Sequence, residues 1–114
     1  MEFYEYFIKL ADVVAEKSKD RSTKVGVVVV GPDREIRSTG YNGFPRGIND
    51  DIDERHERPA KYDWTEHAER NAVYNAARMG QSLKDCTMYF NWEPCPCVDC
   101  ARAIIQAGIT APGR

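Results

Sequence analysis

The chain has 114 residues, a usual length for one domain, so we expect residues 1–114 to form a single unit. Apolar residues make up 42% and charged residues 30%, which excludes a disordered chain and favours a folded, soluble one. The formal net charge of −2 provides no basic field, which argues against a nucleic-acid partner.

The first twenty residues mix Glu2, Glu5 and Lys9 with apolar side chains and do not resemble a signal peptide. No stretch of the sequence is long and apolar enough to cross a membrane, so no membrane partner is expected. We therefore expect a cytoplasmic protein, in a reducing compartment where clustered cysteines indicate metal binding or catalysis rather than disulfides.

The first forty residues predict one helix and two strands. Apolar side chains recur at helical spacing from Phe3 to Val14, with charged residues between them, which predicts an amphipathic helix. Residues 24–30 are β-branched and almost all apolar, so we expect a strand that is buried on both faces. A turn at 31–33 leads to a second strand over 35–39, which we expect to pair with the first as a hairpin.

A long loop is predicted over residues 40–63. The segment GYNGFPRG at 40–47 is too rich in turn residues for a helix or a strand. The following segment, 48–59, holds five carboxylates against two arginines. Loops of this length in small domains are usually functional or disordered.

The second half predicts helix, strand and helix. Thr65 is placed to cap a helix that runs through His67 and ends at Gly80. A strand is predicted over 87–91, a helix over 98–107 that ends at Gly108, and the start of a further strand at 109–110. This order is typical of a three-layer α-β-α fold of the α/β class, a mixed sheet flanked by helices, and we expect its C-terminal strands to be truncated.

The reactive residues gather at the starts of the last two predicted helices. His67 and Glu69 begin one, while Cys97 and Cys100, at i and i+3, share a face of the other. Because a helix N-terminus favours anions, we expect both thiols to ionise easily. One imidazole and two thiolates leave the fourth position of a tetrahedral zinc open for water, which is typical of a catalytic rather than a structural ion. The sequence therefore predicts one catalytic Zn²⁺ per chain.

Cys95 separates two interpretations of the stretch EPCPCVDCAR (93–102), which holds three of the four cysteines. Only Cys97 and Cys100 fit the spacing Pro-Cys-x-x-Cys, so Cys95 is interpreted as a neighbour of the site. As a fourth ligand, Cys95 would close the position that catalysis needs open. The alternative function in that case is a zinc-stabilised binding module without turnover.

His-x-Glu followed by Pro-Cys-x-x-Cys is the signature of zinc-dependent nucleobase deaminases. Four segments resemble successive blocks of the deoxycytidylate (dCMP) deaminase family, within the cytidine deaminase-like superfamily: SKDRSTKVGVVVV, GYNGFPRGI, KYDWTEHAERNAVYNAARMG and PCVDCARAIIQAGI. The resemblance implies a cytidine deaminase-like fold with a five-stranded sheet and one catalytic zinc. It also implies a small-molecule nucleotide substrate, hydrolysis of dCMP to dUMP and ammonia, and a homo-oligomer, either a dimer or a hexamer.

The resemblance also implies roles for individual residues. The zinc ligands would be His67, Cys97 and Cys100. Glu69 would be the catalytic general acid and base, which carries protons from water to the ring N3 and to the departing amine. Asn42 resembles the asparagine that contacts the sugar 3′-hydroxyl, and the Ala68 backbone is expected to meet the pyrimidine edge. Arg46 and Lys24 are candidates for binding the substrate phosphate, although either could equally be an exposed surface cation.

A deaminase of another base, or of a base within RNA such as tRNA adenosine, is the second alternative. It would share all of this chemistry and would differ only in its pocket and surface. The absence of a basic field argues against the RNA substrate.

Overall fold

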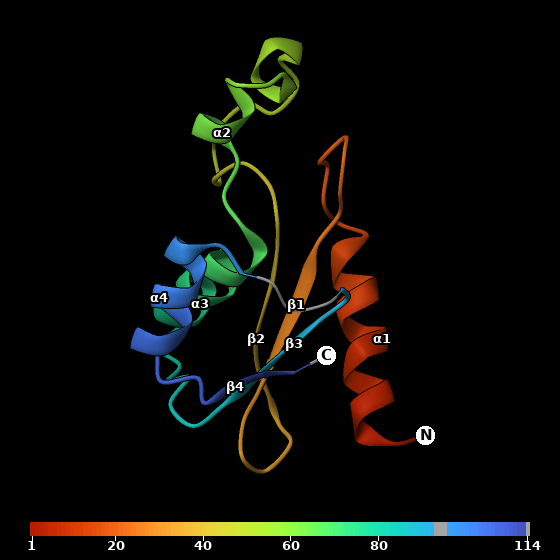
Figure 1. Ribbon diagram of the computed structural model, residues 1–114, viewed down its shortest axis with the longest axis vertical. Coiled ribbons are helices and arrows are strands. Elements are labelled where there is room, and N and C mark those ends of the chain that lie inside the picture. The colour runs from red at the N-terminus through yellow and green to blue at the C-terminus, as the bar shows by residue number, and fades with distance from the viewer. Residues whose placement is uncertain (93–95, 114) are drawn as a thin grey trace.

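The structure, a computed structural model, describes residues 1–92 and 96–113 (Figure 1). Its centre is a four-stranded sheet of order β2-β1-β3-β4. The strands are β1 (Gly26–Val30), β2 (Ile36–Tyr41), β3 (Thr87–Phe90) and β4 (Ala111–Gly113). β1 pairs antiparallel with both β2 and β3, whereas β4 pairs parallel with β3, so the predicted mixed sheet is confirmed.

Helices cover both faces of this sheet, which confirms the predicted three layers (Figure 1). α1 (Phe3–Ala15) lies on one face, while α3 (Ala68–Met79) and α4 (Val98–Gln106) lie on the other. Two short helices, η1 (Asp53–His56) and α2 (Lys61–Trp64), lie beyond the end of the sheet. Within residues 1–92 and 96–113, no helix has the length and apolar character that a membrane span requires.

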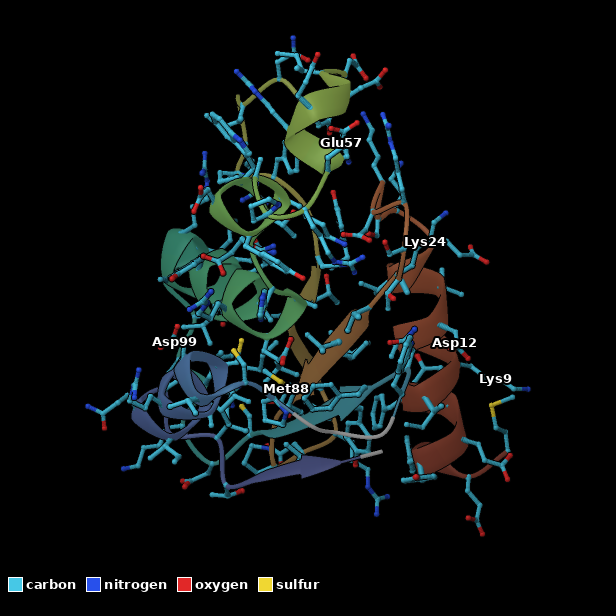
Figure 2. All side chains as sticks on the ribbon, turned by 45° about the horizontal axis from the view of Figure 1, so that its top comes forward. Lys9, Asp12, Lys24, Glu57, Met88 and Asp99 are labelled. Atoms are coloured by element: carbon cyan, nitrogen blue, oxygen red, sulfur yellow. The ribbon has the colours of Figure 1, made fainter. Side chains whose placement is uncertain are left out.

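β1 is buried at all five positions because it lies in the interior of the sheet and between the two helical layers. Val28 and Val30 pack against α1, whereas Val27 and Val29 pack against α3. Met88 of β3 points toward the face of the sheet that α3 and α4 cover, and it is fully buried there (Figure 2). The run of valines in the sequence therefore predicted a doubly covered strand correctly.

β2 continues through Gly40 and Tyr41, which had been predicted as loop. Gly40 lies where the strand crosses α3 at very short range: a Cβ at this position would lie 2.5 Å from the backbone nitrogen of Ala72 and closer still to the carbonyl oxygen of Ala68. The glycine is therefore required for close packing of the strand on the helix rather than for a turn.

The predicted loop over 40–63 contains η1 and most of α2, so the prediction is wrong for residues 53–56 and 61–63. Aromatic stacking organises this segment: the rings of Phe44 and His56 stack with their centroids 4.8 Å apart. The guanidinium of Arg55 lies 4.1 Å from the ring centroid of Trp64. Local side-chain packing of this kind is typical of compact surface loops.

The helix boundaries agree with the sequence at the C-terminal ends and differ at one N-terminal end. Gly80 and Gly108 both adopt positive φ, 71° and 86°, and end α3 and α4 as predicted. The cap of α3 is His67 rather than Thr65, which instead ends α2. The His67 side chain makes no cap hydrogen bond, and its backbone N–H donates to the Glu66 carboxylate at 2.9 Å. The fourth strand begins at Ala111 and not at Ile109.

Candidate active site

The three predicted zinc ligands lie together at the point where α3 and α4 begin. His67 Nδ1 lies 3.2 Å from Cys100 Sγ and 3.4 Å from Cys97 Sγ, and all three ligand atoms lie within 4.8 Å of one another. Around a tetrahedral zinc, a nitrogen and a sulfur ligand would be ~3.6 Å apart. The residues present therefore fit a zinc ion held by one imidazole and two thiolates.

The positions of these ligands follow from the local structure of two helix N-termini. His67 is the N-cap of α3 and Cys97 is the N-cap of α4, both with extended backbone. The Cys97 sulfur accepts the backbone N–H of Cys100 at 3.4 Å, so one ligand caps the helix that carries the other. The Pro-Cys-x-x-Cys motif of the sequence therefore marks the start of a capped helix.

Arg70 joins the two helices beside the ligands, and the sequence analysis did not identify it. Its Nε lies 2.7 Å from the Glu66 carboxylate, and its Nη1 lies 3.5 Å from the Asp99 carboxylate. Asp99 stands between Cys97 and Cys100, so the ion pairs connect the ligand-bearing turns. Spacing along the sequence gave no signal for an interaction between different helices.

The pKa of the Cys100 thiol is raised, which contradicts the expectation that both thiols ionise easily. Burial is the largest cause, followed by the negative charges of Glu69 and Cys97. The helix dipole contributes only about 0.3–1 kcal/mol, whereas burial of a charged group shifts a pKa by several units. A bound zinc cation would supply the positive charge that stabilises this buried thiolate.

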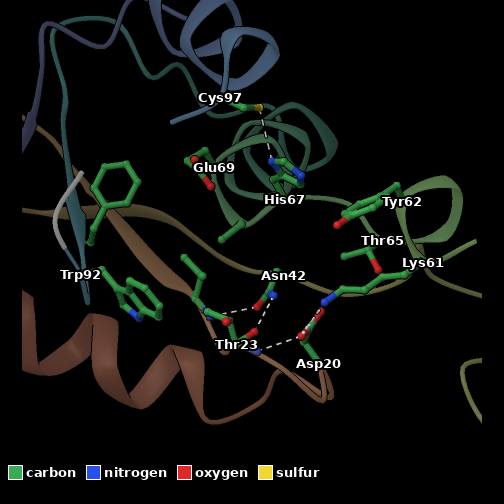
Figure 3. Close-up of a pocket in the computed structure, with 13 residues that line it drawn as sticks. Asp20, Thr23, Asn42, Lys61, Tyr62, Thr65, His67, Glu69, Trp92 and Cys97 are labelled. Atoms are coloured by element: carbon green, nitrogen blue, oxygen red, sulfur yellow. Dashed lines mark hydrogen bonds and ion pairs between the residues drawn. The ribbon is translucent and has the colours of Figure 1, made fainter. Parts of the chain in front are cut away.

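A pocket of about 430 Å³ opens beside the ligands (Figure 3). His67, Cys97 and Glu69 line it near the metal site, and Phe90 and Trp92 are aromatic members of the same lining. Its volume falls within the range of about 300–1,000 Å³ that is typical of small-molecule sites.

Glu69 contributes a carboxylate to the pocket lining, and no described residue contacts it by a hydrogen bond. It is 8% exposed, lies in the first turn of α3 and faces the pocket close to His67 (Figure 3). Among the described residues, no fully buried side-chain nitrogen or oxygen lacks a hydrogen-bond partner, so the carboxylate of Glu69 is open to the pocket rather than sealed in the core. A carboxylate in this position can exchange protons with a bound molecule.

Asn42 lines the same pocket, and its side chain holds two chain segments together. Its Oδ1 accepts the backbone N–H of Val25, and its Nδ2 donates to the carbonyl of Thr23, both at 2.9 Å. One N–H and one acceptor site of the amide remain for another partner. Ala68, which is almost fully buried, also lines the pocket, at the start of α3. The substrate contacts predicted for both residues stay predictions.

The structure does not bring Arg46 or Lys24 to this pocket. The Arg46 guanidinium donates to Asn75 Oδ1 at 2.7 Å and lines a separate hollow. Lys24 is exposed, and its carbonyl accepts from Asn91 Nδ2 at 3.1 Å. Cys95 lies outside the described residues.

An ion pair between Asp20 and Lys61 lines the pocket, and it too was missed by sequence reasoning. Lys61 Nζ lies 3.1 Å from Asp20 Oδ1, and the side chains are only 13% and 5% exposed. Burial alone would raise the pKa of Asp20, but hydrogen bonds from the backbone of Thr23 and Ser22 and from Lys61 lower it overall. Asp20 therefore stays ionised. These two residues are far apart in the sequence, so no local pattern could have paired them.

Comparison with known proteins identifies the family. The cytidine and deoxycytidylate deaminase zinc-binding region matches residues 1–111. The chain belongs to this family. The predicted family resemblance is confirmed, and a zinc cofactor is the expected occupant of the His67, Cys97 and Cys100 site.

Individual deaminases are similar to the chain over most of its length. It is 39% identical, over 96% of its length, to the deoxycytidylate deaminase of Mus musculus, of which it covers 62%. It is 33% identical to the deoxycytidylate deaminase of Enterobacteria phage T4, over 90% of this chain and 72% of that protein. A similar solved structure is that of dCMP deaminase from the cyanophage S-TIM5 in complex with dCMP and dUMP. The two chains superpose with a TM-score of 0.77 and are 29% identical, and the match covers 96% of this chain and 79% of the cyanophage chain. The chain thus spans less than two thirds of the length of the mouse relative.

Proposed function

We propose that this chain catalyses the zinc-dependent hydrolytic deamination of a free pyrimidine nucleotide, dCMP, to dUMP and ammonia. The observation that carries the proposal is the carboxylate of Glu69, which lines a pocket beside a three-ligand metal site. The relatives named deoxycytidylate deaminase and the cyanophage enzyme crystallised with dCMP and dUMP support the choice of substrate.

In this mechanism the protein supplies position and proton transfer. Zinc, when bound, polarises a water so that it is a nucleophile at neutral pH. Glu69 accepts one proton from the attacking water and delivers it to ring N3, then takes the second proton from the new hydroxyl on C4 and gives it to the departing amine. The C4–O bond forms and the C4–N bond breaks, so that dCMP and water give dUMP and ammonia. Burial of Glu69 limits proton exchange with bulk water, and the Ala68 backbone meets the pyrimidine edge.

A free nucleotide is favoured over a base within RNA for two reasons. The pocket has the volume of a small-molecule site, and the chain has a formal net charge of −2. A cytoplasmic location is part of the proposal, because the two ligand thiols must stay reduced to bind the metal.

Association with further copies of the chain is also part of the proposal. α1 exposes Phe3, Tyr4 and Tyr6, each of which is at least two-fifths accessible. Exposed aromatic side chains grouped on one helix are typical of interaction surfaces. Analytical ultracentrifugation should therefore give a mass above that of one chain, and a sedimenting species of one chain at micromolar concentration would contradict this.

Ammonia release across a panel of compounds tests the substrate. The zinc-loaded chain is assayed with dCMP, CMP, deoxycytidine, cytosine, guanine and an adenosine-containing tRNA stem-loop, and dCMP should give the highest kcat/KM. No release from dCMP together with rapid release from another compound would end the dCMP assignment. No release from any of them, with zinc bound, would favour the binding module.

A further inference from the structure

We propose that Lys61 makes the site selective for a phosphorylated substrate, because its ammonium binds the phosphate of the nucleotide while Asp20 holds the lysine in place. This inference rests on the proposed function and extends it to the choice between a nucleotide and its nucleoside. It assigns to the Asp20–Lys61 pair a role that neither Arg46 nor Lys24 can fill from its position.

Lys61 is the only lysine or arginine among the described residues that lines the pocket. Its side chain is 13% exposed, whereas lysines are almost never buried unless they are paired. A lysine on the surface would keep its ammonium in water, so the structure uses Asp20 to retain this charge at the pocket wall.

The ion pair leaves Lys61 able to bind a second anion. Asp20 Oδ1 accepts from the backbone N–H of Ser22 at 2.9 Å and of Thr23 at 3.0 Å as well as from Lys61 at 3.1 Å. The charge of Asp20 is therefore shared among three donors. An ammonium has three N–H groups, and Asp20 takes only one of them. Two N–H groups have no partner among the described residues and are available to phosphate oxygens.

The two ends of the pocket suit the two ends of a nucleotide. In Figure 3, His67 and Cys97 lie at one end of the pocket, and Asn42, Lys61 and Asp20 lie near one another at the other end. A base placed at the metal site with its sugar near Asn42 directs its phosphate toward Lys61.

The simpler interpretation is that the ion pair only fastens residues 18–23 to α2. Both interpretations predict that removal of Lys61 lowers stability, because Asp20 would lose a partner while it remains buried. Only the proposal predicts an effect that depends on whether the ligand carries a phosphate. The test must therefore compare ligands that differ in the phosphate alone.

The experiment measures dissociation constants of the zinc-loaded chain for dUMP and for deoxyuridine by calorimetry. Wild type should bind dUMP more tightly than deoxyuridine. Lys61→Met should weaken dUMP binding at least about tenfold, as expected for loss of a hydrogen bond to a charged group, and change deoxyuridine binding less than about twofold. Lys61→Arg should retain most of the affinity for dUMP. Lys9→Met is the matched control, because it removes the same charge from the outer side of α1 (Figure 2).

Three results would overturn the proposal: dUMP affinity unchanged in Lys61→Met, an equal loss for dUMP and deoxyuridine, or a wild type that binds both ligands equally. Equal binding of both ligands by the wild type would overturn the proposal even if Lys61→Met does not fold. The proposed function has a separate outcome. A wild type that binds dUMP through Lys61 but releases no ammonia from dCMP contradicts the deaminase proposal and leaves the role of Lys61 standing.

Discussion

Replacement of Gly40 by alanine tests how the fold positions the metal site. The added methyl would lie 2.5 Å from Ala72 N, whereas ordinary van der Waals contact begins at 3.4 Å, and all of the nearest atoms are backbone of α3. Relief of the clash requires β2 and α3 to separate by about 1 Å, at a cost of ~1–3 kcal/mol of unfolding free energy. His67 and Glu69 must move with that helix, and a misplacement of ~1 Å costs on the order of 10²-fold in activity.

Two other glycines provide matched controls. Gly43→Ala places its methyl in open space, with no atom within 4 Å, and should match wild type. Gly26→Ala meets the backbone of α1 at Ala15 N, also at 2.5 Å, so it should lose about as much stability as Gly40→Ala. However, α1 carries no zinc ligand, so this control separates loss of stability from loss of the site.

The assay combines urea unfolding with zinc affinity, measured by competition with a chromophoric chelator at a temperature where all variants are folded. Both clashing variants should be destabilised, and only Gly40→Ala should also bind zinc more weakly. The reasoning is refuted if Gly40→Ala is as stable as wild type, or if Gly26→Ala loses as much zinc affinity.

Three further predictions concern single side chains. Cys97→Ser should lower the zinc content, measured by atomic absorption, sharply. Cys86→Ser changes a buried thiol outside the site and should keep the zinc content of wild type. Equal loss of zinc from both variants would reject the ligand assignment. Because native contacts lower the pKa of Asp20 below 3.8, its stabilisation is complete above that value and is lost as pH falls through the lower folded pKa. The stability difference between wild type and Asp20→Asn should therefore be constant from pH 7 to about 5 and shrink below about 4, and a difference that grows in acid would contradict this. Asn42→Asp keeps the oxygen that accepts the Val25 N–H but loses the N–H that donates to the Thr23 carbonyl, so the free energy of unfolding in urea should fall by ~1–3 kcal/mol. An unchanged urea midpoint would count against a structural role for Asn42.

Much of the fold could be predicted from local patterns in the sequence. The valine run predicted β1 because a strand covered on both faces needs apolar residues at every position. Left-handed glycines at 80 and 108 marked the ends of two helices. Local spacing also placed Cys97 and Cys100 on one helical turn, whereas His67 was added from the His-x-Glu signature.

What could not be predicted depends on contacts between distant segments. Gly40 was interpreted as a turn residue because its close contact with α3 has no signature in the neighbouring sequence. Asp20 and Lys61 meet only once residues 40–63 have folded, and their pairing follows from that packing. The pKa of Cys100 was misjudged because the helix dipole is visible in the sequence, whereas complete burial of the thiol is not.

Replacement of Glu69 by glutamine tests the central claim most directly, because it keeps the size of the side chain and removes its ability to carry a proton. Zinc content and ammonia release from dCMP are measured on the same samples of wild type and Glu69→Gln. We expect about one zinc per chain in both proteins, with kcat reduced on the order of 10²–10⁴-fold or more in the variant. A variant that retains both its zinc and its turnover would contradict the assignment of Glu69 as the proton carrier.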